Sequence, residues 1–386
     1  MNNYWKDFIE ASFEWYGNPE AVNLHEPRFG KTDKAYVLDA IDSTFVSSVG
    51  PYVDKVELAL AQLCDTKKAV AVVNGTAALQ VALRLVGVKA GEEVLTQSLS
   101  FVATANAIAF NFAKPIFIDV NLSTMSLCPI ALRVFLESEA EARVEGCFNK
   151  KTGKRIAACV PMHTFGFMAQ MDEITRICEQ WNIAVVEDAA EALGSSYKGQ
   201  KAGSIGDIAA ISFNGNKIIT AGGGGSITTN NEHLAKKAKH LTTTAKVAHT
   251  FDYVHDELGY NFRMPNLNAA LLFAQIARLP DYISQKKALY DHYSTIFKGS
   301  DAIIKPIPEN TDWNYWLSSI QLSNREERDA FLAFTNENKV RTRPIWELLY
   351  RLQMYKDCQR DDQKNAQYLA DRIVNLPSSP KQVYDK

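Results

Sequence analysis

The sequence lacks any excess of charge of one sign. Its 386 residues contain 42 Lys and Arg and 44 Asp and Glu, which gives a formal net charge of −2. This balance excludes the global electrostatic attraction on which a nucleic-acid-binding or polybasic membrane-binding protein relies. Glycine (20) and proline (13) are too scarce for a disordered or fibrous chain. At about 150 residues per domain, we expect a soluble protein of two or three domains that binds neither nucleic acid nor membrane.

Long apolar runs and paired cysteine motifs are absent as well. Charged residues interrupt the stretch where the apolar region of a signal peptide would lie, at Lys6, Asp7, Glu10 and Glu14. No run reaches the roughly 18 apolar residues of a transmembrane helix. The six cysteines show no CxxC or other metal-ligand spacing, which favours reduced thiols and argues against a metal site. These absences predict a cytoplasmic protein.

Short apolar segments alternate with helical patterns between about residues 50 and 240. Strands are expected at 69–73, 93–96, 115–120, 156–162, 183–187, 207–213 and 226–229. Helical patterns lie between them, at 76–86, 102–112, 172–181 and 232–241. This alternation predicts β–α units and a mostly parallel sheet that is covered on both faces.

The two ends of the chain differ from this α/β region. Residues 1–45 show no clear strand, and we expect them to pack on a smaller domain. A long helical stretch covers 265–298, with one break at Pro280. We therefore predict a large domain over 46–280 and a small C-terminal domain over 281–386.

Two short polar segments follow expected strands. Residues 74–78 read NGTAA and open a helix, where free backbone N–H groups and the helix dipole form an anion site. A simple turn with Thr76 or Asn74 as the helix cap explains the same residues. Residues 187–191 read EDAAE after a buried strand, where carboxylates need a cationic partner. Here too a helix cap or a surface loop is the alternative.

A lysine and a run of glycines follow a third strand. Lys217 stands shortly before four consecutive glycines, 222–225, which suggest a close backbone approach or an unusual turn. Such a lysine is a candidate Schiff-base nucleophile or phosphate partner, or an exposed lysine in a flexible loop. Ligands of parallel sheets bind at the carboxyl ends of the strands, so the three features predict one site with an anion cradle, a carboxylate and an amine. Pyridoxal phosphate requires these groups for its phosphate, its pyridinium nitrogen and its aldehyde.

Four blocks of sequence, in this order, resemble a known family. They read VVNGTAALQVAL, SFVATANAIAFNFAKPIFIDV, VVEDAAEALGSSYKGQKAGSIGDIAAISFNGNKIITAGGGG and ELGYNFRMPNLNAALLFAQIARL. They are similar to the DegT/DnrJ/EryC1/StrS family of pyridoxal-phosphate-dependent sugar aminotransferases, and the resemblance covers about residues 35–380. It implies an α/β fold of the aspartate aminotransferase type, with a large domain built on a mostly parallel sheet and a smaller C-terminal α/β domain.

The resemblance also implies an activity. The wording GNKIITAGGGG is most similar to enzymes that aminate C4 of nucleotide-linked 4-keto-6-deoxysugars, among them perosamine synthases and legionaminic-acid-pathway aminotransferases. L-Glutamate is the expected amino donor. A UDP-linked N-acetylated 4-ketosugar is the preferred substrate, and GDP-4-keto-6-deoxymannose is the alternative. Two rival functions are a related sugar dehydratase, which has histidine in place of Lys217, and a non-catalytic regulatory protein with this fold.

Residue roles follow by position from the resemblance. Lys217 would hold the cofactor as an internal aldimine, and Asp188 would pair with its pyridinium nitrogen, so both are expected to be catalytic. Glu191 stands near the phenolic oxygen, where many members have Gln. Asn261 would reach the phosphate from a second subunit, which predicts a homodimer with shared sites. The expected cofactor-binding residues are Gly75, Thr76, Ala77, Phe101, Asp188, Glu191, Ser212, Lys217 and Asn261.

Substrate contacts are expected from a smaller group, His163, Arg263, Arg343 and Trp346. Arginine pairs with phosphate, and tryptophan can stack on a base or a sugar. Each residue also has an ordinary structural explanation, as a satisfied strand-end histidine, a surface ion pair or core packing. The same alternative applies to Phe101, which either stacks on the cofactor ring or belongs to the core.

Overall fold

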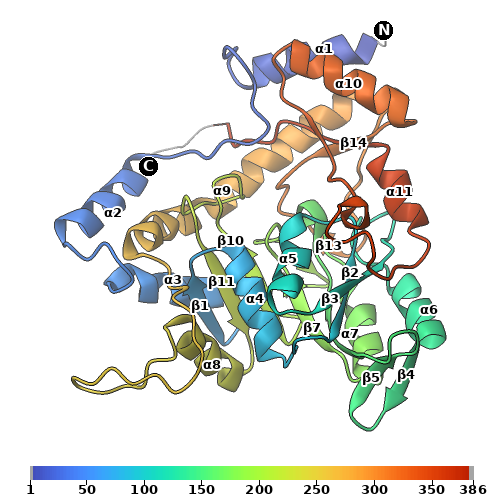
Figure 1. Ribbon diagram of the computed structural model, residues 1–386. Coiled ribbons are helices and arrows are strands. Elements are labelled where there is room, and N and C mark those ends of the chain that lie inside the picture. The colour runs from blue at the N-terminus through green and yellow to red at the C-terminus, as the bar shows by residue number, and fades with distance from the viewer. Residues whose placement is uncertain (1–2, 382–386) are drawn as a thin grey trace.

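A nine-stranded sheet forms the centre of the protein (Figure 1). This computed structural model describes residues 3–381, so the outer ends of the expected terminal segments, 1–2 and 382–386, lie outside the described residues. The strands are β1 (Lys68–Val72), β2 (Glu93–Gln97), β3 (Lys114–Ile118), β4 (Ala140–Arg143), β5 (Gly146–Asn149), β6 (Arg155–Val160), β7 (Ala184–Asp188), β10 (Ile208–Ser212) and β11 (Gly225–Thr229). Their order is β1-β11-β10-β7-β6-β2-β3, and β5 pairs with both β6 and β4.

The sheet is mainly parallel. β10, β7, β6, β2 and β3 run in the same direction, whereas β11 pairs antiparallel with both β10 and β1. Each strand expected from the sequence has a counterpart here, displaced by no more than a few residues. The predicted α/β class with a mostly parallel central sheet is thereby confirmed.

Helices cover both faces of this sheet (Figure 1). They are α3 (Pro51–Leu63), α4 (Gly75–Leu85), α5 (Val102–Phe110), α6 (Pro129–Glu139), α7 (Met171–Gln180) and α8 (Glu232–Thr242). Alternate residues of β1 show the two faces, because Ala69 and Ala71 join one buried apolar cluster while Val70 and Val72 join another. Burial on both faces explains why these strands are apolar runs.

A second, antiparallel sheet lies in the C-terminal part of the chain. Its strands, in spatial order, are β12 (Ile303–Ile304), β14 (Ser319–Gln321), β16 (Ile373–Asn375) and β15 (Arg343–Pro344). α10 (Arg325–Glu337) packs against β15 and β16, and α11 (Lys364–Ala370) leads into β16. A third small sheet joins β13 (Thr311–Asp312) to β8 (Ser196–Tyr197) and β9 (Gln200–Lys201), so the C-terminal region is tied to the segment that follows β7.

The N-terminal helices pack in two places. α1 (Asn3–Trp15) lies beside α10 (Figure 1), and its Phe8 is fully buried against Tyr293, Phe297 and Phe331. α2 (Lys31–Asp42) packs on α9 (Asn266–Ile296), the helix that carries Tyr293, but farther along it, where Tyr36 stacks on Phe273. The N-terminal segment therefore contacts both the small antiparallel region and the long helix.

α9 is continuous, so the break expected at Pro280 is wrong. Proline removes one backbone hydrogen bond of a helix and crowds the carbonyl four residues earlier. Pro280 is exposed here, whereas Leu279 and Tyr282 are buried, so packing on both sides holds the helix together across it. The suggested domain boundary at 280/281 thus lies inside one helix. Although α9 has 31 residues, neither it nor any other helix within residues 3–381 is long and apolar enough to cross a membrane.

Candidate active site

A cavity of about 330 Å³ lies where β7 and β10 end and α4 begins. Residues from all three polar features of the sequence line it, and Trp316 and Trp346 from the C-terminal region complete it. The lining residues that carry reactive or hydrogen-bonding groups include Thr76, Asp188, Glu191, Ser212 and Lys217. The expected convergence of an amine, carboxylates and a helix N-terminus is therefore found.

Lys217 lies in the loop that follows β10. Its Nζ atom is 3.2 Å from Oε1 of Glu191 and 4.3 Å from the centre of the Trp316 ring. The Glu191 side chain is only 2% exposed, and its Oε2 accepts a hydrogen bond from the N–H of Phe165 at 2.9 Å. Burial raises the pKa of Glu191 to about 7, although Lys217 and the Phe165 N–H favour its charged form. An amine and a carboxyl group that titrates near neutrality thus stand in direct contact.

Asp188 is the last residue of β7 and is buried. Its Oδ2 accepts a hydrogen bond from Thr104 at 2.7 Å, and its Oδ1 accepts one from the N–H of Ala190 at 3.2 Å. Burial raises the pKa of Asp188, and these two hydrogen bonds oppose the increase. Among residues 3–381 no side chain forms an ion pair with it. A buried carboxylate in this condition favours a cationic ligand atom in the cavity.

The N-terminus of α4 provides hydrogen-bond donors. The N–H groups of a first helical turn have no acceptor within the helix, and Gly75 and Thr76 line the cavity. Asn74 caps the helix, because its Oδ1 accepts the N–H of Ala77 at 2.8 Å. Ala77 itself does not line the cavity within the described residues, so its expected contact with a phosphate requires that this capping bond be exchanged. Ser212 lies directly against Gly75 on the cavity wall.

The glycine run serves two different purposes. A Cβ atom at Gly225 would lie 2.5 Å from the carbonyl carbon of Asn74, so only glycine lets β11 pass this close to the start of α4. Gly222 has a φ of +75°, in the left-handed region that favours glycine, where the chain turns back after the Lys217 loop. The close approach and the unusual turn expected from the sequence are both present.

His163 lies behind the cavity, beside the end of β7, where its backbone N–H donates to the carbonyl of Asp188. Its Nδ1 accepts the N–H of Ala169 at 3.1 Å, so Nε2 carries the proton and donates to Oε2 of Glu187, also at 3.1 Å. The imidazole is fully buried and does not line the cavity within the described part of the chain. The contact expected between His163 and a substrate is therefore not found, because the ring is engaged by Glu187.

Phe101 and Trp346 line the cavity, as the sequence suggested. Phe101 precedes α5 and is 50% exposed, which leaves ring surface free for stacking. Trp346 packs against Phe165, with the ring centres 4.9 Å apart. Phe101 is thus exposed at the cavity, whereas Trp346 is half-buried and packs against the apolar core.

Three expected contacts lie away from the cavity of their own chain. Asn261 is exposed, and its Oδ1 accepts a hydrogen bond from Nε of Arg263 at 3.0 Å. Arg343 is exposed at the start of β15 and donates to Oδ1 of Asn336 at 3.1 Å. Within the described residues, none of the three lines the cavity. The hydrogen bond to Asn336 gives Arg343 an ordinary structural role. The expected action of Asn261 on a second subunit stays a prediction.

Sequence reasoning missed the residues that approach from elsewhere. Trp316 touches Lys217, Asn314 binds the backbone of Glu191, and Thr104 binds Asp188. The only signal for the first two is the segment Trp-Asn-Tyr-Trp at 313–316, which places two of the six tryptophans of the chain within four residues. Thr104 lies one helical turn from Phe101, but nothing in its own sequence context points to Asp188.

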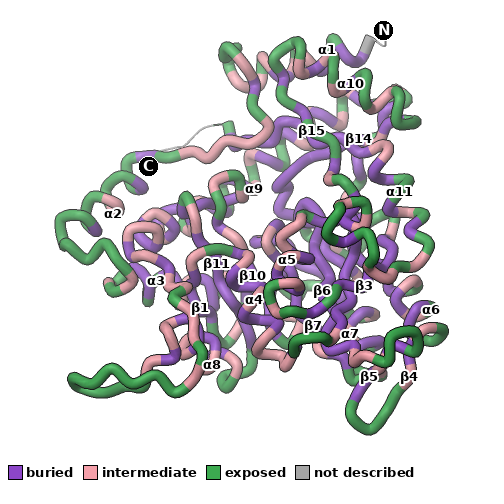
Figure 2. Tube along the Cα trace, in the orientation of Figure 1, coloured by how far each residue is buried: buried purple, intermediate pink, exposed green. Residues whose placement is uncertain are grey.

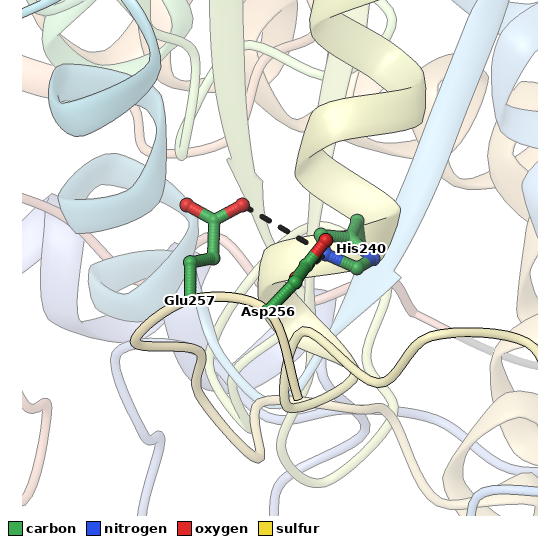
Figure 3. A group of neighbouring side chains, drawn as sticks. All are labelled: His240, Asp256 and Glu257. Carbon is green, nitrogen blue, oxygen red and sulfur yellow. Dashed lines mark hydrogen bonds and ion pairs between the residues drawn. The ribbon is translucent and has the colours of Figure 1, made fainter. Parts of the chain in front are cut away.

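One acidic cluster lies outside the cavity, at the end of α8 (Figure 3). Nε2 of His240 is 2.6 Å from Oδ1 of Asp256 and 3.7 Å from Oε1 of Glu257. These residue types can bind a metal ion. However, Glu257 also forms ion pairs with Lys237 and Arg84, which already compensate its charge. The cluster is therefore explained as an ion-pair network that fastens the loop after α8.

The cavity has the groups that pyridoxal phosphate requires. The buried carboxylate of Asp188 suits a pyridinium nitrogen, the start of α4 with Ser212 suits a phosphate, and the amine of Lys217 suits an aldehyde. The exposed ring of Phe101 suits a flat aromatic ligand. The residues present therefore fit this cofactor.

Comparison with known proteins supports this assignment. The DegT/DnrJ/EryC1/StrS aminotransferase family matches residues 27–385. The chain is 33% identical over 361 residues to the GDP-perosamine synthase of Escherichia coli O157:H7, covering 93% of both chains. It is 32% identical to the GDP-perosamine synthase of Caulobacter vibrioides, covering 92% of this chain and 93% of that one.

Solved structures show the same fold. The aminotransferase TlmJ from Streptoalloteichus hindustanus matches with a TM-score of 0.84 and 24% identity over 95% of both chains. A putative sugar aminotransferase from Streptococcus pneumoniae, solved in its PMP form, matches with a TM-score of 0.84 and 22% identity, over 95% of this chain and 94% of that one. The predicted family, fold and cofactor are confirmed: the chain belongs to the DegT/DnrJ/EryC1/StrS family and is a pyridoxal-phosphate-dependent sugar aminotransferase.

Proposed function

We propose that this sugar aminotransferase moves the amino group of L-glutamate to C4 of a nucleotide-linked 4-keto-6-deoxysugar. The observation that carries the proposal is the contact between Lys217 and Glu191 in a cavity that also holds Asp188 and the start of α4. The similarity to enzymes named GDP-perosamine synthase supports the sugar class.

The polar residues at the cavity have separate roles in this proposal. Bound pyridoxal phosphate supplies an electron sink for the carbanion left when a proton leaves the carbon that bears the amino group. Lys217 anchors the cofactor and, once released, moves that proton as a general acid and base. Asp188 keeps a positive charge on the ring nitrogen, and Thr104 fixes the direction of its carboxylate. Gly75, Thr76 and Ser212 bind the phosphate.

Two nucleotide sugars are candidates for the acceptor. The sequence wording favoured a UDP-linked N-acetylated 4-ketosugar. The relatives favour the alternative, GDP-4-keto-6-deoxymannose, because three of them at 31–33% identity are named GDP-perosamine synthase. We therefore place the GDP-linked sugar first and keep the UDP-linked sugar as the competitor. The aromatic rings of Trp316 and Trp346 on the cavity wall suit stacking on a sugar.

We also propose that the active enzyme is a homodimer with shared sites. Asn261 and Arg263 lie outside the cavity of their own chain and are hydrogen-bonded to each other, in a position that a second copy can reach. The loop after α8 projects from the body and is exposed (Figure 2). Large apolar side chains are exposed on this loop, on α2 and α3 and in the segment between these helices; they include Leu38, Ile41, Phe45, Val46, Leu58, Phe251, Tyr253 and Leu258. Such clustered exposure favours a protein interface.

The substrate proposal is tested with purified protein. We expect a visible absorption band from the bound cofactor that glutamate removes, and that Lys217→Ala lacks. A panel of GDP- and UDP-linked 4-ketosugars with glutamate should then give one aminated sugar, identified by mass spectrometry. If the cofactor binds but no ketosugar is aminated, the sugar assignment is wrong.

The dimer is tested by mixing two inactive variants. Lys217→Ala and Asn261→Ala are each expected to have little activity as homodimers. Subunit exchange would give mixed dimers in which one site has both Lys217 and Asn261 intact, so activity should return. Sedimentation of the wild type should show a dimer. Absence of recovery, with exchange demonstrated, would contradict shared sites.

A further inference from the structure

The 313–316 segment reaches the cavity from the C-terminal region, and three of its side chains donate hydrogen bonds to backbone carbonyls around it. Nε1 of Trp313 donates to the carbonyl of Phe165 at 2.9 Å, and Nδ2 of Asn314 donates to the carbonyl of Glu191 at 2.8 Å. Nε1 of Trp316 donates to the carbonyl of Asn216 at 2.9 Å, the residue next to Lys217. One segment therefore holds the backbone on both sides of the Lys217–Glu191 contact.

The segment is itself fixed from behind. The backbone N–H of Trp316 donates to Oδ1 of Asn314 at 3.0 Å. The carbonyl of Trp316 accepts a hydrogen bond from Nζ of Lys286, a buried lysine of α9, at 3.1 Å. Gly166 leaves room for the Asn314 side chain, because a Cβ atom at Gly166 would lie 2.1 Å from Oδ1 of Asn314. Trp316, which is 3% exposed, thus has a defined position and not merely a place on the cavity wall.

We propose that the face of Trp316 and Oε1 of Glu191 together hold the free side chain of Lys217, and that Trp316 is thereby a positioning residue for it. The proposal rests on the proposed role of Lys217. A lysine that is released during each turnover has four rotatable bonds and would otherwise lose its alignment. An ammonium group over an indole face and beside a carboxylate is stabilised by a cation–π contact and an ion pair, both of which are strengthened by burial.

The holding site should respond to pH through Glu191. The charged groups that face Glu191 are Lys217 and Asp188. The 313–316 segment and the turn at 163–166 bring hydrogen-bond donors from Asn314 and Phe165, and the imidazole in that turn is directed to Glu187 instead. Because the pKa of Glu191 lies at about 7, its carboxylate attracts the amine above this pH and loses its charge below it.

The experiment measures how fast the Lys217 amine of the cofactor-free protein is acetylated by trace acetic anhydride, with peptide mass spectrometry as the readout. Loss of the aromatic face in Trp316→Leu should raise the rate about three- to tenfold at pH 8, because the amine is no longer held against the ring and meets the reagent more often. Trp316→Phe keeps an aromatic face and should restore most of the protection. Glu191→Gln should raise the rate about tenfold at pH 8 but only about twofold at pH 6, where the wild-type carboxyl group is protonated as well.

The matched control is Trp346→Leu, which opens the same cavity but removes a ring that packs against Phe165, and it should change the rate less than twofold. A Trp316→Leu rate within twofold of the wild type, or a Glu191→Gln effect that is the same at pH 6 and pH 8, overturns the proposal. If Trp316→Leu does not fold, the Trp316→Phe and Glu191→Gln arms decide. Because the labelling needs neither cofactor nor sugar, it stays informative even if no ketosugar is aminated, a result that would refute the proposed function alone.

Discussion

Two buried glutamates near the carboxyl end of β7, Glu187 and Glu191, have pKa values shifted in opposite directions. Behind the strand, Glu187 accepts hydrogen bonds from the N–H groups of Gly203, Ile205 and Gly206 and from His163. Burial alone would raise the pKa of Glu187, but these donors hold it below its ordinary value. In front, Glu191 has the N–H of Phe165 and the amine of Lys217, and burial raises its pKa to about 7.

The difference shows that one buried glutamate has a structural role and the other a role in the chemistry of the cavity. A carboxylate with four donors is a fixed ion that fastens the chain, and a proton on it would break those bonds. Glu191 accepts hydrogen bonds from two donors only and is buried, so its carboxyl group can gain or lose a proton near pH 7. The same residue type thus serves as an anchor behind the sheet and as a responsive group in the cavity, four positions along the chain.

The largest expected effect tests whether the carboxylates that face the cavity take part in the reaction. Asp188→Asn should lower kcat about a hundred- to a thousandfold, because the charge that stabilises a positive ring nitrogen is lost while the shape is kept. The midpoint of thermal unfolding should change little. Steady-state kinetics with glutamate and calorimetry check this, and an Asp188→Asn enzyme with wild-type kcat would remove Asp188 from the mechanism.

The next effect tests whether Glu187, behind the strand, stabilises the fold. Glu187→Gln places an amide N–H₂ against backbone N–H donors and should lower the free energy of unfolding by about 3–4 kcal/mol. Since the folded-state pKa of Glu187 is depressed, its contribution is present above its ordinary pKa and is lost as pH falls through the folded pKa. Denaturant unfolding at pH 7 and pH 4 measures this. A destabilisation that is unchanged on acidification would contradict the assignment.

Glu191 should show the opposite sign of pH dependence in the cofactor-free protein. Its pKa rises from 4.5 to about 7 on folding, so the cost of its ionisation is absent below pH 4.5, builds up to pH 7 and is constant above. Relative to the wild type, the stability of Glu191→Gln should therefore increase by about 3 kcal/mol across this window. Urea unfolding at pH 4.5, 6 and 7.5 gives the comparison, and parallel curves for the two proteins would refute it.

The smallest effect concerns the support of Asp188. Thr104→Val keeps the shape but removes the 2.7 Å hydrogen bond to Oδ2, and we expect about a tenfold weaker binding of pyridoxal phosphate. Ser100, whose hydroxyl contacts that of Thr104 at 2.9 Å, is the control, and Ser100→Ala should weaken binding less than threefold. Equal losses in both variants would mean that the hydroxyl pair acts through packing alone.

The sequence was sufficient for those parts of the site that depend on local pattern. Buried strands are apolar runs, and Asp188 and Lys217 follow such runs directly, so their meeting at one sheet edge could be predicted. The C-terminal contribution could not, because Trp316 lies 100 residues after its partner Asn216 and no local pattern links them. The direction of the His163 ring likewise depends on Ala169 and Glu187, which only the folded chain brings together.

The continuous α9 has a mechanical consequence. At about 1.5 Å per residue, its 31 residues form a rod about 46 Å long. One end is clamped by α2 and α3, and the other lies in the aromatic cluster around Phe8. Lys286, on the same rod, ties it to Trp316. Any rocking of the C-terminal region against the large sheet must flex this rod, most easily at Pro280, where one rung of the hydrogen-bond ladder is missing. The stiffness of this helix thereby adds to the β8–β13 pairing and the hydrogen bonds of the 313–316 segment in aligning the two sides of the cavity.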